Sequence, residues 1–385
     1  MLDVKSCYLK DKKIVVAVSS SISAIESIKL MRELKRHGAY IYCIATKEAL
    51  NIVGEKALKF ASDEFYVDIE KAEHVYLYEN ADLLVIYPAT ANTISKINLK
   101  IADNILTTTA LMFLNYKPTI IVPAMHINML KNIETHLNEL KKNENLYIIK
   151  PKIEEGKAKI ADYKEVVKKC IDVIGVKPKK SVLVINGATA EFIDNVRIIT
   201  NLSSGKFGKA IAEEFSKEFY VEVVQGLGDY PYYLKVHKVL TVNEMLNKSL
   251  ELAKDFDAII VPAAISDFIP EKMEGKISSD KDNIILKLKR APKVLEELRK
   301  KYKNKIIVGF KAEYNISKDE LIRRAKERLK KYKLNMIVAN DLSKYYFGSD
   351  VVECYLITNN DIIKVCGSKK EVAKEIVEKV KEMIP

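Results

Sequence analysis

The sequence predicts an α/β protein built from two doubly wound, Rossmann-like domains. Short apolar segments alternate with longer segments of helical periodicity, which is typical of parallel sheets covered by helices on both faces. The 385 residues exceed one ordinary hydrophobic core, since a domain usually takes ~100 to 200 residues. A polar link around Pro178 divides the alternation into two series that share no repeat. We therefore predict one domain over residues 1–177 and a second over residues 178–385.

The elements of the first series follow from their apolar periodicity. A helical pattern over residues 22–37 ends at Gly38, since glycine favours a helix C-terminus. Another helix is predicted over residues 163–174, with Cys170 on its core-facing side. Strands are predicted over residues 14–19, 40–46, 83–87, 119–123 and 146–149.

The second series carries more strand candidates than the first. An amphipathic helix over residues 370–383 closes the chain, because its apolar residues recur at helical spacing. The alternation again predicts a doubly wound sheet. Its strands are predicted over residues 182–186, 221–225, 258–262, 284–288, 306–310, 336–339 and 352–358.

The composition argues against several classes of protein. No apolar run approaches the ~20 residues that span a bilayer, and the first residues show no apolar core followed by a cleavage site. The five cysteines are odd in number and form no CxxC pair, which argues against a disulfide framework or a zinc site. We therefore expect a soluble cytoplasmic protein that does not bind membranes.

The net charge of +12 raises the question of a nucleic-acid partner. The 64 basic residues are spread over helix faces and mixed with glutamate, without the single basic stripe that nucleic-acid binding favours. A positive surface also concentrates small phosphorylated molecules by long-range attraction. We expect anionic small molecules as partners and no nucleic acid.

The segment over residues 81–109 runs from a buried strand into a loop rich in hydrogen-bonding groups. Pro88 lacks an N–H and is expected to end the strand. Small residues follow, which allow a flat ligand to approach the backbone at the carboxyl end of the strand, where parallel sheets bind ligands. The alternative is a plain helix N-cap at Asn92 or Thr93.

Ser20 and Ser21 lie in the turn between the first strand and the first helix. The N–H groups at a helix start, together with the helix dipole, favour a phosphate at this place. The alternative is that these hydroxyls only cap the helix.

The sequence PATANT at residues 88–93, with the Lys, ADN and TTT that follow, resembles the flavin-binding loop of the phosphopantothenoylcysteine decarboxylase family of flavoproteins. The resemblance implies bound flavin mononucleotide (FMN). It also implies that His74 is the catalytic base, which accepts a proton from the substrate while the flavin oxidises the cysteinyl carbon and carbon dioxide then leaves. The FMN-binding residues that it implies are Ser20, Ser21, Thr46, Ala89, Thr90 and Asn92.

Two features depart from this family. Its Pro-x-Met-Asn motif ends here in Met125-His126, so an imidazole replaces the amide that helps to hold the substrate carboxylate. The resemblance implies substrate binding by Met125 and His126, with Asn128 nearby. A cysteine of the family's flap has no counterpart in residues 150–162, so the reductive half of the reaction must use another proton source or an unrecognised residue.

In the second domain, a polar stretch over residues 186–208 follows a strand and leads into a helix. It contains neither the GxxxxGK[ST] pattern of a P-loop nor the GxGxxG turn of a dinucleotide site. One interpretation is a ligand loop. The alternative is that Ser203 or Ser204 caps the helix and the glycines serve packing.

This stretch, with matches over residues 262–268, 276–278, 308–313 and 338–341, resembles the phosphopantothenate–cysteine ligase family. The resemblance implies that a carboxylate is activated by CTP as an acyl-cytidylate, with Mg²⁺ screening the triphosphate. Only the first lysine of the family's Lys-x-Lys-Lys motif is kept, as Lys276, and no metal ligands are identified. The implied catalytic residues are Asn201, Arg197 and Lys276, and the implied substrate-binding residues are Gly187, Ser203, Ser204, Gly205, Ala264, Asp267 and Phe310.

Together the two resemblances cover nearly the whole chain and imply a bifunctional enzyme of coenzyme A biosynthesis. Its substrates would be 4′-phosphopantothenate, cysteine and CTP, with ATP as the open alternative to CTP. The families imply a homo-oligomer, with trimers of the flavin half and dimers of the ligase half. A second hypothesis is a flavin-binding regulatory protein with a ligase domain and no decarboxylase activity. A nicotinamide-dependent oxidoreductase is disfavoured, because neither domain has a glycine-rich dinucleotide turn.

Overall fold

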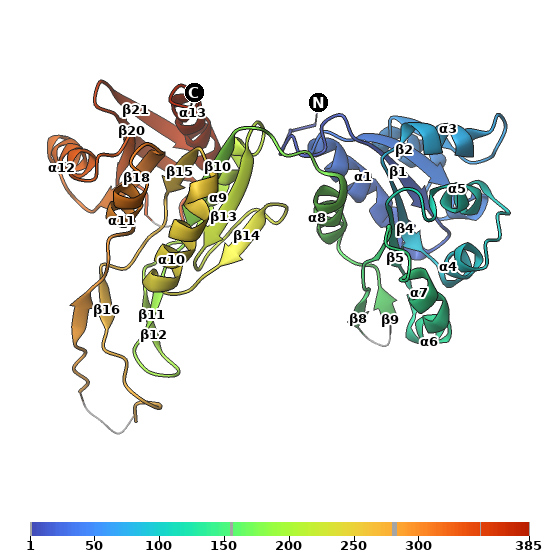
Figure 1. The fold of residues 1–385 in the computed structure, drawn as a ribbon, viewed down its shortest axis with the longest axis horizontal. Coiled ribbons are helices and arrows are strands. Elements are labelled where there is room, and N and C mark those ends of the chain that lie inside the picture. Colours follow the sequence, from blue (N-terminus) through green and yellow to red (C-terminus); the bar gives the residue numbers. More distant parts are fainter. Residues whose placement is uncertain (1, 155–156, 279–282, 347, 385) are drawn as a thin grey trace. The chain divides into compact units, whose positions relative to one another are not determined.

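The computed structural model describes residues 2–154, 157–278, 283–346 and 348–384. The chain divides into two compact units, Met1–Lys177 and Pro178–Pro385, each with its own main sheet (Figure 1). The predicted α/β class with two parallel sheets is confirmed. No helix in the described ranges is both long enough and apolar enough to cross a membrane.

The first unit is built on a six-stranded sheet in the order β3-β2-β1-β4-β5-β7. Every neighbouring pair is parallel, so the carboxyl ends of all strands lie at the same edge. β1 and β4 occupy the middle because they are apolar on both faces and can be covered on both. The strands are β1 (Lys13–Val18), β2 (Tyr40–Ala45), β3 (Glu64–Tyr66), β4 (Leu83–Ala89), β5 (Thr119–Pro123) and β7 (Leu146–Ile148).

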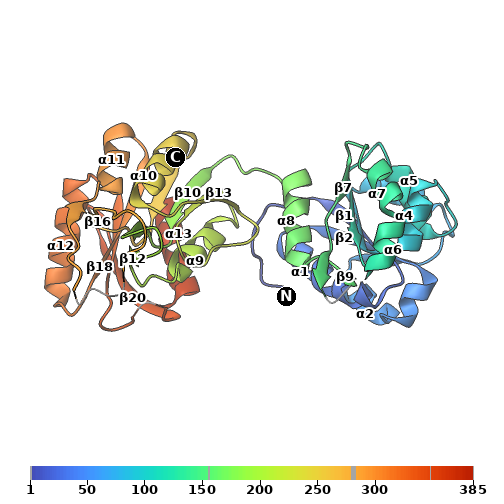
Figure 2. The same ribbon diagram turned by 90° about the horizontal axis from the view of Figure 1, so that it is seen from below.

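Helices cover both faces of this sheet (Figure 2). On one face α1 (Ser27–Arg36) packs against α8 (Tyr163–Ile174), and Cys170 is buried there as predicted. On the other face apolar side chains of α3 (Glu73–Asn80), α4 (Ala91–Asn98) and α5 (Ile105–Phe113) form a core with the strands. The remaining elements are α2 (Glu55–Ala61), α6 (Ile127–Asn132), α7 (Glu134–Leu140), the 3₁₀ helices η1 (Ile22–Glu26) and η2 (Lys47–Asn51), and a small sheet of β6 (Met125–His126), β9 (Lys157–Lys159) and β8 (Lys152–Glu154).

Two local predictions for this unit are wrong. Pro88 does not end its strand: β4 continues to Ala89, which pairs with Pro123 after a shift of register. The shift accommodates the residue that cannot donate to the ladder. The helical segment after β1 starts as the 3₁₀ helix η1 and becomes α-helical only from Ser27.

The second unit has an eight-stranded sheet in the order β14-β13-β10-β15-β18-β19-β20-β21. Its pairs are parallel as far as β19, and the hairpin of β20 and β21 adds an antiparallel edge. The strands are β10 (Ser181–Asn186), β13 (Tyr220–Gln225), β14 (Lys235–Lys238), β15 (Ala258–Val261), β18 (Ile306–Glu313), β19 (Met336–Asp341), β20 (Val351–Ile357) and β21 (Ile362–Ser368).

Helices again lie on both faces of the sheet. α9 (Lys206–Phe215) and α13 (Lys369–Lys381) pack against each other on one face. α10 (Val242–Leu252), α11 (Val294–Lys301) and α12 (Lys318–Lys331) supply apolar side chains to a core on the other face. A short 3₁₀ helix, η3 (Ala253–Asp255), follows α10.

Two small ribbons extend from this unit (Figure 1). One pairs β11 (Ala190–Phe192) with β12 (Ile198–Thr200), and the other pairs β16 (Phe268–Pro270) with β17 (Leu288–Arg290). The strand predicted over residues 284–288 is therefore wrong, because β17 starts at its last residue and does not join the main sheet. Ile285 is 84% exposed, and an apolar run does not show whether anything covers it.

Candidate active sites

The first cavity lies at the carboxyl ends of strands β1 to β4, where each strand passes into a loop. Its volume of about 570 Å³ is within the range usual for ligand pockets. Of the residues predicted to bind a cofactor, Ser20, Thr46, Thr90 and Asn92 line it. The other described residues that line it are Ser19, Lys47, Glu48, Val67, Asp68, Thr93, Lys96, Asp103, Asn104, Thr107 and Met129.

Ser19 joins the loops that follow β1 and β4. Its buried hydroxyl donates to Pro88 O at 2.8 Å and accepts from Thr90 N at 3.2 Å. Ser20 and Thr90, on the two loops, therefore line one cavity although they are far apart in the sequence.

The N-cap of α4 is Thr90, and not Asn92 or Thr93 as in the capping alternative. Thr90 Oγ1 accepts from Thr93 N at 3.2 Å, which satisfies one of the free N–H groups at the helix start. Asn92 takes the second helical position, and its side chain is exposed at the cavity. The cap does not use Asn92, so its amide is available to a ligand.

The two lysines that line this cavity are each neutralised by a carboxylate. Lys47 pairs with Asp68 at 2.6 Å, and Lys96 pairs with Asp103 at 2.5 Å. The hydrogen bond from Lys96 lowers the pKa of Asp103, and the bond to Asp68 raises the pKa of Lys47. The groups left for a ligand are mainly neutral hydroxyls and amides.

Three residues predicted for the flavin site do not line this cavity. Ser21 caps η1 by accepting from Ser23 N, and Ala89 is buried in β4. His74 lies in the first turn of α3, and its buried Nδ1 has no hydrogen-bond partner in the part of the chain that the structure describes.

The residues predicted to bind the decarboxylase substrate, Met125, His126 and Asn128, lie beside residues 150–162, the segment that corresponds to the family's flap. Met125 and His126 make up β6, which pairs with β9, so this group holds the flap strand. His126 Nδ1 accepts from Asn128 N at 3.2 Å and caps α6. Met129, in the same helix, lines the cavity, so this group adjoins it.

In the second unit, Asn186 at the end of β10 fixes the floor of another cavity. Asn186 is 2% exposed, and its Nδ2 donates to Gln225 Oε1 and Asp229 O at 3.0 Å and to Gly205 O at 3.2 Å. These bonds hold the start of α9 against the sheet. Gly208 is required there, since a Cβ would lie 1.9 Å from Asn186 Oδ1.

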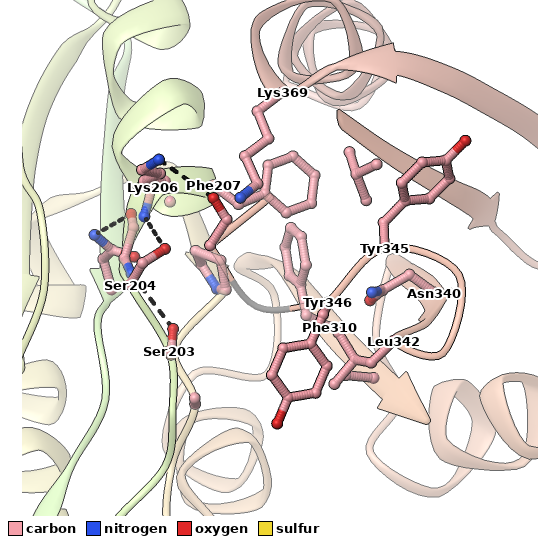
Figure 3. A pocket seen from close by; sticks show the side chains of 18 of the residues that line it. Ser203, Ser204, Lys206, Phe207, Phe310, Asn340, Leu342, Tyr345, Tyr346 and Lys369 are labelled. Carbon is pink, nitrogen blue, oxygen red and sulfur yellow. Dashed lines mark hydrogen bonds between the residues drawn. The ribbon is translucent and has the colours of Figure 1, made fainter. Parts of the chain in front are cut away.

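Gly205 is the N-cap of α9, and not Ser203 or Ser204 as in the capping interpretation. Its φ of 72° lies in the left-handed region that favours glycine. The hydroxyls of Ser203 and Ser204 lie 3.4 Å from Gly205 N and Lys206 N. Figure 3 shows Ser203, Ser204 and Lys206 along one side of the cavity.

The cavity consists of two adjoining hollows. The α9 hollow, of about 150 Å³, lies against Ser203, Ser204 and Gly205. The Asp267 hollow, of about 290 Å³, lies against Asn201 and Asp267. The two hollows share Ala263, Ala264, Phe310, Ala312 and Leu342.

Phe310 is the largest side chain common to both hollows. Its ring packs edge-on against Phe207, with the ring centres 5.7 Å apart. This contact fixes an aromatic surface where the hollows meet, a surface on which a flat base can pack.

Asn201 and Asp267 are held by neighbouring groups of the Asp267 hollow. Asn201 Nδ2 donates to Ala264 O at 3.0 Å, and Asp267 forms an ion pair with Lys293. Gly187 lies behind this hollow: its carbonyl accepts from Ala264 N at 2.9 Å, and it does not line either hollow.

Arg197 and Lys276 lie outside both hollows. The buried carboxylate of Asp194 accepts from Arg197 Nη1 at 2.6 Å and from Ile277 N at 3.1 Å, which ties the two segments together. Burial raises the pKa of Asp194, but its hydrogen bonds outweigh burial and hold the pKa below the usual range. The Arg197 guanidinium also donates to Ile277 O, whereas the Lys276 side chain is exposed.

Within the described ranges, no group of three or more His, Cys, Asp or Glu side chains is placed to hold a metal ion. The five cysteines are all free.

Residues 4–175 match the family model "Flavoprotein", and residues 178–384 match the model "DNA/pantothenate metabolism flavoprotein C-terminal domain". A relative from Methanocaldococcus jannaschii, "Coenzyme A biosynthesis bifunctional protein CoaBC", is 61% identical over 99% of this chain and 96% of its own length. The protein of the same name from Thermococcus kodakarensis is 37% identical over 99% of this chain and 97% of its own. The chain belongs to the CoaBC family.

Membership of this family confirms the resemblances inferred from PATANT and from the stretch over residues 186–208. A further relative, the "Cysteine/Cysteine sulfinic acid decarboxylase" of an unknown prokaryotic organism, is 33% identical over 81% of this chain and 92% of its own length.

The structure adds residues that the sequence did not single out. In the first unit, Ser19 directly precedes Ser20, and Met129 directly follows Asn128. Both line the cavity, and their position beside predicted site residues was a usable signal in the sequence. In the second unit, Lys206 and Phe207 follow Gly205 directly. Asn340 lies in the matched segment 338–341, so a signal for it was present. Other described residues of the α9 hollow come from distant parts of the chain and carried no signal: Tyr345, Tyr346, Val351, Val352 and Lys369.

Proposed function

We propose that this chain catalyses two successive reactions of coenzyme A biosynthesis. The second unit joins 4′-phosphopantothenate to cysteine, and the first unit decarboxylates the product to 4′-phosphopantetheine. The observation that carries this proposal is the 61% identity, over 99% of the chain, to a bifunctional coenzyme A biosynthesis protein. A separate cavity in each unit is consistent with two separate reactions. A cytoplasmic location belongs to the same proposal.

The residues of the first cavity fit FMN. Ser20, Thr46, Thr90 and Asn92 offer hydrogen-bonding groups at the carboxyl ends of strands, where parallel α/β sheets bind nucleotides. The lysines that line it are paired with carboxylates, which suits a flat ring system that is largely uncharged. Bound FMN would supply a reversible two-electron oxidation and reduction of the substrate.

We assign proton transfer in this unit to His74. Its buried Nδ1 makes no hydrogen bond among the described residues, so this nitrogen does not tie the imidazole to a structural role. Oxidation of the carbon next to sulfur gives a thioaldehyde, which takes up the electron pair left when carbon dioxide departs. His74 does not line the cavity of its own unit, and this supports the trimer that the resemblance implies, in which a neighbouring copy completes the site.

His126 is suited to hold the substrate carboxylate. Its Nδ1 accepts from Asn128 N, so the neutral imidazole carries its hydrogen on Nε2. This N–H can donate to a carboxylate as an amide would.

In the second unit, a carboxylate oxygen of 4′-phosphopantothenate attacks the α-phosphorus of CTP and pyrophosphate leaves. The amine of cysteine then attacks the acyl carbon of the acyl-cytidylate, and CMP leaves. We assign the cytidine to the Asp267 hollow against Phe310, and phosphates to the α9 hollow, where the N–H groups at the start of α9 favour anions. We assign the acyl-cytidylate to Asn201, which lines the Asp267 hollow and donates to the carbonyl of Ala264, a residue common to both hollows.

Mg²⁺ belongs to this proposal as a companion of the nucleotide. The described residues offer no cluster of metal ligands, and Mg²⁺ commonly takes its ligands from phosphate oxygens and water. Arg197 and Lys276 lie outside both hollows, which supports their action on a neighbouring copy in the dimer that the resemblance implies.

Two assays test the proposal with the purified chain. Pyrophosphate release with 4′-phosphopantothenate and cysteine should be faster with CTP than with ATP. Carbon dioxide should be released from supplied 4′-phosphopantothenoylcysteine without any nucleotide. No pyrophosphate with either nucleotide would contradict the ligase assignment.

The absence of cysteine from residues 150–162 favours a second candidate for the first unit, a flavin-binding regulatory domain without decarboxylase activity. A protein that binds FMN and ligates cysteine, yet releases no carbon dioxide from the supplied intermediate, would establish this candidate instead.

A further inference from the structure

Two helices begin at the α9 hollow, and each has a lysine as its first residue. Lys206 starts α9 and Lys369 starts α13, and both side chains line the hollow. In Figure 3 the Lys369 side chain extends from α13 toward Phe207, on the side where α9 begins. The packing of α13 against α9 thus brings two ammonium groups to one small cavity.

These two lysines differ in their partners. Lys206 Nζ donates to Asp350 Oδ1 at 3.0 Å and to Gly348 O at 3.2 Å. The hydrogen bond from Lys206 lowers the pKa of Asp350, so this carboxylate is already paired with Lys206. Lys369 has no hydrogen-bond or ion-pair partner for its ammonium in the described ranges, although Asp350 contributes some attraction.

The position of Lys369 is unfavourable for the stability of the fold. A cation at the first residue of a helix is repelled by the positive end of the helix dipole. The pKa of Lys369 is lowered, first by burial and second by the nearby ammonium of Lys206. The start of α13 does not need this lysine, because Ser368 and Glu371 already form a capping box.

We propose that Lys369 binds a phosphoryl group of a substrate of the ligase reaction, an assignment that rests on the proposed ligase function. An anion in the α9 hollow would give Lys369 the ion-pair partner that the described residues do not provide, and Lys206 would reinforce the attraction. The phosphoryl group belongs either to the triphosphate of CTP or to the 4′-phosphate of the acid. Lys369 is a binding residue in this assignment and takes no part in bond making.

The test compares Lys369→Ala with Lys374→Ala in the full-length protein. Lys374 lies on the same helix, is exposed and does not line the hollow, so it controls for loss of one charge from α13. Calorimetric titration with each ligand alone, which excludes turnover, gives the Kd for CTP with Mg²⁺ and for 4′-phosphopantothenate. Cytidine and pantothenate, which lack the phosphoryl groups, serve as reference ligands, and Lys369→Arg tests whether the charge restores binding.

We expect Lys369→Ala to raise the Kd of one of the two phosphorylated ligands by about 10- to 100-fold, as for the loss of a charged hydrogen bond. The ligand that weakens identifies the source of the phosphoryl group. Lys374→Ala and the reference ligands should show changes below about 2-fold, and Lys369→Arg should recover most of the affinity. Because its position is unfavourable, replacing Lys369 should leave the Tm unchanged or raise it.

Unchanged Kd values for both phosphorylated ligands in Lys369→Ala would overturn the assignment while leaving the ligase function intact. The assignment would also be overturned if the Tm fell and the affinity for cytidine and pantothenate fell by the same factor, since that result indicates a structural role. If the parent protein bound neither phosphorylated ligand, the ligase function itself would fail, and this assignment with it.

Discussion

The cavities of the two units lie at the same place in similar sheets but differ in charge. In the first unit both lysines at the cavity are paired with carboxylates, Lys47 with Asp68 and Lys96 with Asp103. In the second unit, the α9 hollow brings together Lys206, which is paired, and Lys369, which has no ion-pair partner among the described residues. The parallel sheet therefore fixes where a ligand binds, whereas the loops and helix starts decide which charge is accepted.

The largest expected effects come from disabling each unit separately. Asn201→Asp places a negative charge beside an anionic acyl phosphate, so it should stop amide formation and leave decarboxylation of supplied 4′-phosphopantothenoylcysteine unchanged. His74→Asn cannot take up the proton and should do the reverse, with a loss of ~10² to 10⁴ in rate. Product assays on both variants measure this. Full decarboxylation by His74→Asn would remove His74 from the mechanism and favour the regulatory candidate.

A charge change at the first cavity should be the next largest effect. Asn92→Asp adds a carboxylate to a cavity in which both lysines are already paired with carboxylates, so FMN should be retained about 10-fold less tightly. Fluorescence titration of the apoprotein with FMN measures the Kd. Asn132→Asp, an exposed position of the same unit away from the cavity, is the matched control. Equal affinity in the two variants would contradict the placement of FMN beside Asn92.

Acid should weaken the two units over different pH ranges. Burial lowers the pKa of His37 in the first unit, so the stability that neutral His37 provides is lost as the pH falls below about 6.5. Hydrogen bonds lower the pKa of Asp194 in the second unit despite its burial, so its contribution is lost only as the pH falls below about 4.

Thermal unfolding of the parent, His37→Asn and Asp194→Asn between pH 3 and 8 measures these contributions. The Tm difference between parent and His37→Asn should shrink below about pH 6.5, and the difference for Asp194→Asn should stay constant down to about pH 4. A His37→Asn difference that is the same at pH 5 and pH 8 would show that His37 does not change its charge in this range.

The smallest effect is expected from separating the units. Residues 178–385 should keep ligase activity within about 2-fold of the full chain, because the unit has its own core and its own cavity. The fragment should include Lys180, whose carbonyl accepts from Tyr220 N and whose ammonium donates to Ile384 O. An insoluble or inactive fragment, under conditions where the full chain works, would place the functional boundary elsewhere.

Several elements follow from local periodicity alone. The helix of residues 163–174 and the strand of residues 119–123 have the predicted ends, because their apolar patterns and flanking polar residues agree. The strand over residues 284–288 failed, because apolar residues in an exposed ribbon have the same local pattern as a buried strand. The capping alternative named the wrong residues for a related reason: Thr90, Asn92 and Thr93 are all acceptable caps, and only the path of the chain selects Thr90.

The sequence by itself determined the two-domain α/β class, the CoaBC family and the loops that end β1, β4 and β10, since apolar periodicity and contiguous motifs are local properties of the chain. Only the tertiary structure decided that Ser19 links two loops, that Phe310 contributes to two hollows, and that Lys369 shares a cavity with Lys206. These relations depend on which segments the sheet order and the packing of α13 against α9 bring together, and residues far apart in the chain carry no local signal of such contacts.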